Sequence, residues 1–156
     1  MSTSDEPSDD ADPGASDAAA LQRHLMAFVR AFGLHRSDET PCGTPVPVSE
    51  AHALSVLADD GPLHQTDLVH HLALGKSTVS RLVDQVVARG WARRTTSADD
   101  ARRRLVELTP AGCQAASTLA QARATRIARL LQRIPPADRP AVLGALETLT
   151  EAARER

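Results

Sequence analysis

The sequence predicts a mainly α-helical fold that carries one small β-wing. Apolar residues recur every three or four positions through most of residues 18–156, which is the period of amphipathic helices. The exception lies at 91–108, where the runs WARRTT and RRLVEL flank the turn sequence SADDA, as the strands of a hairpin do. At 156 residues, the chain is long enough for one domain with a buried core.

The composition excludes several classes of protein. With 42% hydrophobic and 24% charged residues, the chain is typical of a globular protein in water. No apolar run approaches the ~20 residues that span a bilayer, and the N-terminus lacks the basic and apolar segments of a secretory signal. We therefore expect a cytoplasmic protein without membrane contact. Two cysteines, Cys42 and Cys113, are too few for a disulfide framework or a Cys-based zinc site.

The formal net charge of −2 conceals an uneven distribution. Residues 1–20 contain six acids and no base, so the remainder of the chain has a net charge of +4. The segment 75–110 contains eight bases and four acids, which matches that whole excess. A local basic patch on a near-neutral body is typical of a nucleic-acid-binding surface, although a solvated charged face gives the same count.

The N-terminal part divides into a tail, a helix and a loop. Residues 1–17 are mostly Ser, Asp, Pro and Gly, which predicts a disordered acidic tail. Residues 18–47 form the next segment, which begins with a helix to about residue 35 and ends in a Pro-rich loop. One stripe of this helix is apolar and consists of Leu21, Leu25, Phe28 and Phe32.

Three helices are predicted next. Ser49 is a suitable N-cap for the first, which Gly61 and Pro62 end. The second covers 65–72, and a turn at 73–75 leads into the third, at 76–89. Two short helices joined by a Gly-containing turn form a helix-turn-helix pattern.

The helix at 76–89 has two distinct faces at about 100° per residue. The face predicted to pack on the core consists of Val79, Leu82, Val83 and Val86. The opposite side and its flanks consist of Ser77, Thr78, Ser80, Arg81, Asp84, Gln85 and Ala88. Small hydroxyl side chains and an Arg suit a helix that enters the major groove of DNA. A surface helix whose Ser and Thr residues serve only as caps would have the same composition.

The segments after this helix complete the pattern. Gly90 ends the helix, the hairpin follows, and Thr109 and Pro110 form the N-cap and first-turn pair of a new helix. Helix, hairpin and helix in this order predict a winged helix-turn-helix domain at 48–109. The positive charge around the wing comes from Arg89, Arg93, Arg94, Arg102, Arg103 and Arg104.

Residues 110–156 predict two further amphipathic helices, interrupted by Pro135 and Pro136. The first, at 110–134, has an apolar stripe of Ala116, Ala120, Ile127, Leu131 and Ile134. The second begins near Asp138, with Val142, Leu146 and Leu149 on one face. We expect 18–47 and 110–156 to be dimerisation segments, because two interlocked copies would bury more apolar surface than one.

The segment 48–112 resembles the MarR (multiple-antibiotic-resistance regulator) family of bacterial transcription factors. The resemblance rests on GPLHQTDLVHHLAL, KSTVSRLVDQVVARGW, the triplet DAR at 100–102, and LVELTPAG. It implies a homodimer whose first and last helices interlock. The two recognition helices would enter successive major grooves of a pseudo-palindromic double-stranded DNA operator, with the wings toward the minor groove.

The resemblance also implies roles for individual residues. The residues expected at the DNA are Lys76, Ser77, Thr78, Ser80, Arg81, Gln85, Arg94, Asp100, Arg102 and Arg103. Arg102 would approach the minor groove at the tip of the wing, with Asp100 holding its guanidinium. Arg94 would contact or brace the DNA backbone. Arg103 and Arg104 would compensate for Ala101, which replaces a basic residue usual in the family.

We therefore predict a sequence-specific DNA-binding transcriptional regulator, a repressor that a small molecule or a stress signal releases from DNA. Related repressors often bind aromatic anions between the dimer helices and the DNA-binding lobe, and basic residues at 23, 24, 30 and 35 are available as anchors. Two alternatives stay open. One is a winged-helix interaction module that does not bind DNA. The other is a redox-sensing regulator that uses Cys42, a residue expected to be exposed in its Pro-Cys-Gly loop with no base nearby to lower its pKa.

No enzyme, metal site or cofactor is predicted. The chain has no Ser/His/Asp, Cys/His or paired-carboxylate arrangement and no phosphate-binding loop. The adjacent His70 and His71 point about 100° apart on a helix, so they cannot share a metal as residues four apart do.

Overall fold

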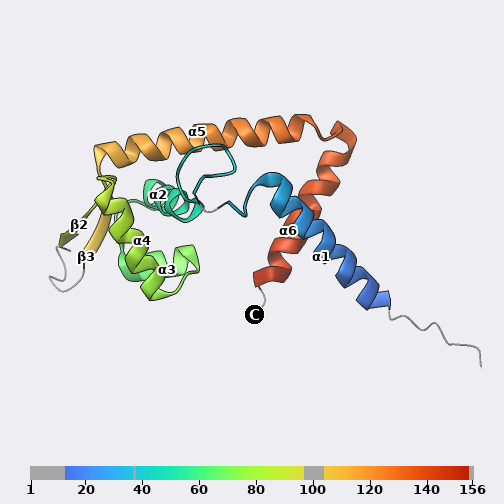
Figure 1. The fold of residues 1–156 in the computed structure, drawn as a ribbon, viewed down its shortest axis with the longest axis horizontal. Coiled ribbons are helices and arrows are strands. Elements are labelled where there is room, and N and C mark those ends of the chain that lie inside the picture. Colours follow the sequence, from blue (N-terminus) through green and yellow to red (C-terminus); the bar gives the residue numbers. More distant parts are fainter. Residues whose placement is uncertain (1–12, 37, 97–103, 155–156) are drawn as a thin grey trace, which may run out of the picture.

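The computed structural model describes residues 13–36, 38–96 and 104–154. The elements, in order, are α1 (Pro13–Phe32), α2 (Val48–Asp60), β1 (Leu63–His64), α3 (Gln65–Leu72), α4 (Lys76–Ala88), β2 (Ala92–Thr96), β3 (Arg104–Leu108), α5 (Pro110–Gln132), the 3₁₀ helix η1 (Pro136–Asp138) and α6 (Arg139–Arg154). Helix α5 runs along the molecule, from a lobe of α2–α4 and the sheet to α1 and α6 at its far end (Figure 1). This architecture confirms the predicted fold class.

The sheet has one strand more than predicted. Its antiparallel order is β1-β3-β2, with Ala92 opposite Leu108 and Leu63 opposite Val106. Strand β1 is only two residues long, too short to show an alternating pattern in the sequence. It forms because Leu63 packs against the core and its backbone pairs with β3.

Several helix ends agree with the sequence. Helix α3 covers Gln65–Leu72 as predicted, and α4 begins at Lys76 with Gly75 as its N-cap. At the start of α5, the Thr109 hydroxyl accepts a hydrogen bond from the Gly112 backbone N–H, and Pro110 occupies the first turn.

Two predicted helix starts were wrong. Helix α2 begins at Val48, with Pro47 at the N-cap position, because the Pro47 carbonyl already accepts a hydrogen bond of 3.0 Å from the Ala51 N–H. Ser49 is therefore inside the helix. Helix α1 begins at Pro13, so residues 13–17 of the predicted tail are helical. Proline is tolerated there, since its missing N–H would have no partner in a first turn.

Two apolar clusters hold the lobe together. The larger lies among α2, α3, α4 and the sheet, and contains Val79, Leu82, Val83 and Val86, so the predicted core face of α4 is confirmed. The smaller cluster joins α2 to α5 and consists of Val46, Ala51, Leu54, Ala116 and Leu119, with Trp91, Leu108 and Ala115 packed against it.

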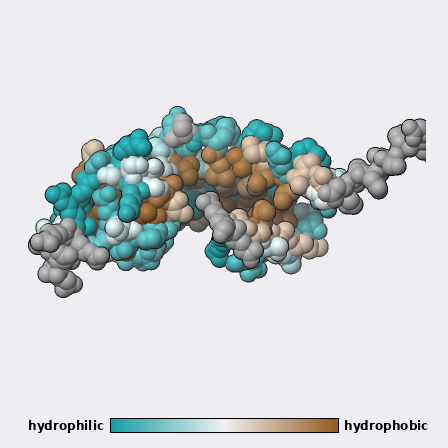
Figure 2. Space-filling model, turned by 90° about the horizontal axis from the view of Figure 1, so that it is seen from below, coloured by the Kyte–Doolittle hydropathy of each residue, from teal (hydrophilic) through white to brown (hydrophobic). Residues whose placement is uncertain are grey.

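The opposite end of the molecule leaves apolar side chains uncovered. No residue of α6 is buried, and Leu143 and Leu146 are 60% and 50% exposed. Further exposed apolar residues are Leu21, Leu25, Met26, Phe28, Leu34, Ile127, Leu131 and Val142. A broad apolar area is visible on this side of the molecule (Figure 2). Among the helices that the structure describes, none is both long and apolar enough to cross a membrane.

Candidate nucleic-acid interface

The outward face of α4 is polar and positively charged. Lys76, Ser77, Thr78, Arg81 and Gln85 are exposed, while Ser80 is half-buried beside the core face. The Arg81 Nε donates to the Ser77 carbonyl over 3.4 Å, so its side chain lies back along the first turns of the helix. Six of the predicted DNA-contacting residues thus share one accessible helix surface.

Arg94 connects the wing to this helix. Its Nη2 lies 2.6 Å from the Asp84 Oδ1, and the two side chains are 24% and 62% exposed. A pair this open to solvent contributes at most about 1 kcal/mol to stability. Its main effect is to hold the Arg94 guanidinium between α4 and β2. Asp84 was expected on the outer face of the helix, but its pairing with Arg94 was not predicted.

The described part of the wing carries a second ion pair. Arg93 and Glu107 face each other across β2 and β3, with 2.7 Å between the Arg93 Nε and the Glu107 Oε1. Asp100, Arg102 and Arg103 lie at 97–103, outside the described residues. Their assignment to the wing tip therefore stays a prediction.

The end of α4 is attached to the rest of the lobe by polar contacts. Arg89, the C-cap residue, places its Nε 2.6 Å from the Oε2 of Glu50, and Glu50 is only 3% exposed. The Thr109 hydroxyl donates to the Gly90 carbonyl over 2.6 Å, and the Thr109 N–H donates to the Trp91 carbonyl over 3.0 Å. This role of Glu50 was not predicted, because a Glu in the first turn of a helix is common for electrostatic reasons alone.

An apolar cavity of about 300 Å³ lies where α2, α5, the end of α1 and the loop at 40–42 meet. Its apolar lining includes Phe32, Leu34, Val48, Ala51, Leu119 and Ile127. Three basic side chains also line it, namely His52, Arg123 and Arg126. The Arg126 guanidinium lies 5.6 Å from the centre of the Phe32 ring. The basic residues near the first helix that were considered as anchors do not line this cavity.

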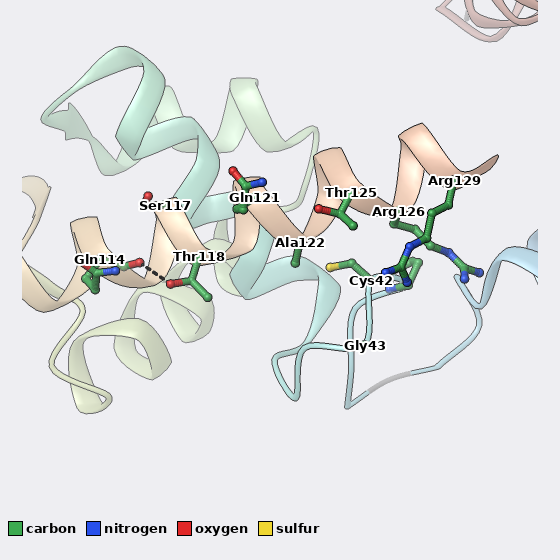
Figure 3. Close-up of a pocket in the computed structure, with 11 residues that line it drawn as sticks. Cys42, Gly43, Gln114, Ser117, Thr118, Gln121, Ala122, Thr125, Arg126 and Arg129 are labelled. Atoms are coloured by element: carbon green, nitrogen blue, oxygen red, sulfur yellow. Dashed lines mark hydrogen bonds between the residues drawn. The ribbon is translucent and has the colours of Figure 1, made fainter. Parts of the chain in front are cut away.

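A polar groove of about 740 Å³ adjoins the cavity and shares Pro41, Cys42 and Arg126 with it. Figure 3 shows Cys42 on its loop facing α5, where Thr125, Arg126 and Arg129 lie close by. Polar residues nearer the wing, including Gln114, Thr118 and Gln121, continue the groove along α5 (Figure 3).

The environment of Cys42 differs from the one expected. The residue is half-buried, and its sulfur lies 2.8 Å from the Thr40 hydroxyl and 3.7 Å from the Thr44 hydroxyl. Burial by itself raises the pKa of the Cys42 thiol, but these hydrogen bonds stabilise the thiolate and bring the pKa below its usual value. The expectation of an exposed thiol was wrong. The pKa was expected to have no nearby base to lower it, and hydroxyl groups of the same loop lower it instead.

The part of the chain that the structure describes contains no group of three or more His, Cys, Asp or Glu residues arranged to hold a metal ion. His71 Nδ1 lies 3.4 Å from the Asp60 Oδ2, which is a pair and not a ligand set.

Comparisons with known proteins agree with this architecture. Residues 44–103 match the model of the MarR family. The putative transcriptional regulatory protein for the hcr operon of Thauera aromatica is 30% identical over 96 residues, which are 62% of this chain and 58% of that protein. The chain spans between 37% and 58% of the length of the curated relatives it matches.

Solved structures match over almost their whole length. RV1404 from Mycobacterium tuberculosis is 25% identical, with a TM-score of 0.62 over 97% of this chain and 98% of that one. BpsR from Bordetella bronchiseptica, whose structure concerns the regulation of its DNA binding by 6-hydroxynicotinic acid, has the same fold at 22% identity. Its TM-score is 0.62 over 86% of this chain and 98% of that one. The family match covers α2, α3, α4 and strands β1 and β2, so the segment 44–103 belongs to the MarR family. The match to solved structures extends this shared fold to the flanking helices.

Proposed function

We propose that this protein is a sequence-specific, double-stranded DNA-binding transcriptional regulator that acts in the cytoplasm. The observation that carries the proposal is α4, which buries Val79, Leu82, Val83 and Val86 and turns a polar, positive face to solvent beside a winged sheet. A helix with small hydroxyl side chains and an Arg on its free face fits the major groove. The relative from Thauera aromatica is described as a transcriptional regulator, which supports the proposal.

For the described residues, the proposed contacts follow from the position of each side chain. Ser77, Thr78, Ser80 and Gln85 would reach base edges, while Lys76 and Arg81 would reach bases or phosphates near the start of α4. Arg94, held by Asp84, would contact the backbone beside the helix. At the wing, Arg102 with Asp100, and Arg103, would approach the minor groove, whose negative potential favours Arg.

The working form is a homodimer on a pseudo-palindromic operator. Exposed apolar side chains on α1, the far half of α5 and α6 support this, since isolated soluble chains rarely leave so much contiguous apolar surface uncovered. Two half-sites one helical turn apart would then be bound together, which raises affinity and fixes their spacing.

The effector is a small organic anion with an apolar, planar body. The cavity between α2 and α5 supports this choice, because apolar side chains form its walls while Arg123, Arg126 and His52 offer positive or hydrogen-bonding groups. We propose that the protein is a repressor and that occupation of this cavity releases it from DNA. Regulation of BpsR by 6-hydroxynicotinic acid is a precedent on the same fold.

A second candidate signal is an oxidant acting on Cys42. The lowered pKa of this thiol and its place between the cavity and the polar groove favour it. Thiolates react with peroxides to form sulfenic acid, whereas thiols do not do so readily.

The test is binding of the purified chain to the DNA upstream of its own gene, measured by gel shift at two salt concentrations. We expect a retarded complex that weakens steeply with salt, because phosphate contacts release counterions. Arg81→Ala should weaken binding, whereas Arg133→Ala, which removes an exposed Arg from the far end of α5, should not. Absence of any complex at low salt would favour the interaction-module alternative.

A further inference from the structure

We propose that Glu50 is a positioning residue for α4, the DNA-reading helix, and that α2 couples Glu50 to the apolar cavity. The inference rests on the proposed DNA binding and on the proposed effector cavity. Four observations carry it: the burial of Glu50, its ion pair with Arg89, the packing of Trp91, and the placement of α2 between the cavity and α4.

Glu50 is an unusual residue to find almost completely buried. It is 3% exposed, and the Arg89 Nε at 2.6 Å is the only ionic partner of its Oε2 among the described residues. No described group, Arg89 included, makes a hydrogen bond with that oxygen, so the ion pair alone compensates its burial. A buried carboxylate without its cation is strongly unfavourable. The folded lobe therefore keeps the end of α4 against the first turn of α2.

Arg89 is fixed on a second side by an aromatic ring. Its guanidinium lies 4.9 Å from the centre of the Trp91 ring, at a distance typical of cation–π contacts. Trp91 is itself anchored, since its carbonyl accepts the hydrogen bond from the Thr109 N–H that starts α5. A guanidinium held by both a carboxylate and an indole has few other positions, so α4 has few other orientations.

Helix α2 lies between the cavity and this contact. Val48, Ala51 and His52 line the cavity, whereas Glu50 is about 200° around the helix from Val48, on the side facing α4. The first turn of α2 thus has the cavity on one side and the reading helix on the other. Any displacement of that turn moves Glu50 and, through it, Arg89.

The small apolar cluster gives a second connection. Ala51 and Leu119 line the cavity and also belong to the cluster on which Trp91 packs. Closely packed side chains transmit displacements instead of absorbing them. An occupant that separates α2 from α5 would therefore disturb both supports of Arg89, the carboxylate and the ring.

The expected consequence is a loss of sequence discrimination. A tilted α4 would still present Lys76 and Arg81 to phosphates, but its hydroxyl groups would no longer align with base edges. Binding to unrelated DNA should then persist while binding to the operator falls.

The experiment compares two duplexes by fluorescence anisotropy. One is selected in vitro by the native protein from random sequences, and the other is its shuffled counterpart. Glu50→Gln keeps the shape of the side chain and removes its charge. Its matched control is Glu107→Gln, which removes the charge from the exposed Arg93–Glu107 pair on the wing. Thermal unfolding confirms that each variant is folded.

We expect Glu50→Gln to reduce the ratio of selected to shuffled affinity by at least about fivefold, the lower end of ordinary coupling between sites. Glu107→Gln should change both affinities alike. Val48→Phe fills the cavity from α2. As a single substitution it should lower the ratio of selected to shuffled affinity, and added to Glu50→Gln it should have little further effect. Such non-additivity identifies a shared route, which a merely structural role of Glu50 would not produce.

An unchanged ratio in Glu50→Gln would overturn the inference, and so would independent, additive effects of Val48→Phe and Glu50→Gln. If Glu50→Gln does not fold, the double variant Glu50→Gln, Arg89→Gln takes its place, because it removes both charges of the pair. Failure of the native chain to select any DNA would instead refute the proposed function, and the inference with it.

Discussion

At Gly112 the backbone of α5 lies so close to Trp91 that replacing this glycine by Ala should destabilise the whole protein. A Cβ at this position would lie 1.8 Å from the Trp91 carbonyl oxygen and 2.8 Å from its carbonyl carbon. Real Cβ contacts essentially never fall below 3.0 Å, so the two backbones must separate by at least about 1.2 Å. The obstacle is backbone, and side-chain rotation cannot relieve it.

The size of the effect follows from three contributions. Forcing an extra methyl group into packed structure costs about 3 kcal/mol where nothing flexible can move. The separation also weakens the 3.0 Å hydrogen bond from the Thr109 N–H to the Trp91 carbonyl, which costs about 1 kcal/mol. Ala favours a helix over Gly by about 1 kcal/mol. The net loss is about 3 kcal/mol, or roughly 6–12 °C in Tm for a chain of this length.

Thermal unfolding followed by circular dichroism measures this loss. Gly144→Ala is the matched control, because a Cβ at this position of α6 would meet no other atom within 4 Å, and the variant should gain up to about 1 kcal/mol. Both variants are measured at one protein concentration, since the Tm of a dimer depends on it. A Tm for Gly112→Ala equal to or above that of the native protein would show that α5 and the Trp91 backbone are not packed this closely.

Three further outcomes are expected. Arg102→Ala should weaken operator binding by ~1–3 kcal/mol, the scale of one specific contact. Arg133→Ala, titrated in the same way, is the control for the loss of one positive charge. If Arg102→Ala binds the operator as tightly as the native protein, Arg102 does not contact DNA. Thr40→Val should raise the pKa of the Cys42 thiol and slow its alkylation near neutral pH, because the thiolate loses a hydrogen bond that lowers this pKa. The alkylation rate of Cys113 in the same chain should not change. Leu146→Asp on the exposed face of α6 should shift the protein from dimer to monomer in sedimentation, whereas Glu147→Gln beside it should not; an unaltered dimer would exclude this face from the interface.

The parts of the fold that the sequence predicts are those with local causes. The core face of α4 follows from the spacing of Val79, Leu82, Val83 and Val86 along one helix. The start of α5 follows from Thr109 and Pro110, two adjacent residues that satisfy and shape a first turn. Each of these signals lies within a few residues of the structure it determines.

The features that escape prediction depend on residues distant in the sequence. Strand β1 exists only because β3, about forty residues later, offers a partner for Leu63. Arg123 and Arg126 reach the cavity because the loop after α1 folds back onto α5, so basic residues near α1 were the more obvious anchors. In the sequence, Glu50 is an ordinary acidic residue in the first turn of a helix. Its pairing with Arg89, at the end of α4, appears only in the folded lobe.

The long-range contacts of Trp91 also explain why the proposed DNA recognition and the stability of the fold depend on the same residues in this chain. Trp91 touches α4 through Arg89, α5 through the Thr109 N–H, and the cavity wall through the cluster of Ala51 and Leu119. A substitution that loosens Trp91 must therefore lower stability and disturb the reading helix together. Glu50 differs in one respect, because Glu50→Gln removes charge without removing volume. It is thus the position at which the orientation of α4 can be altered while the packing around Trp91 stays in place.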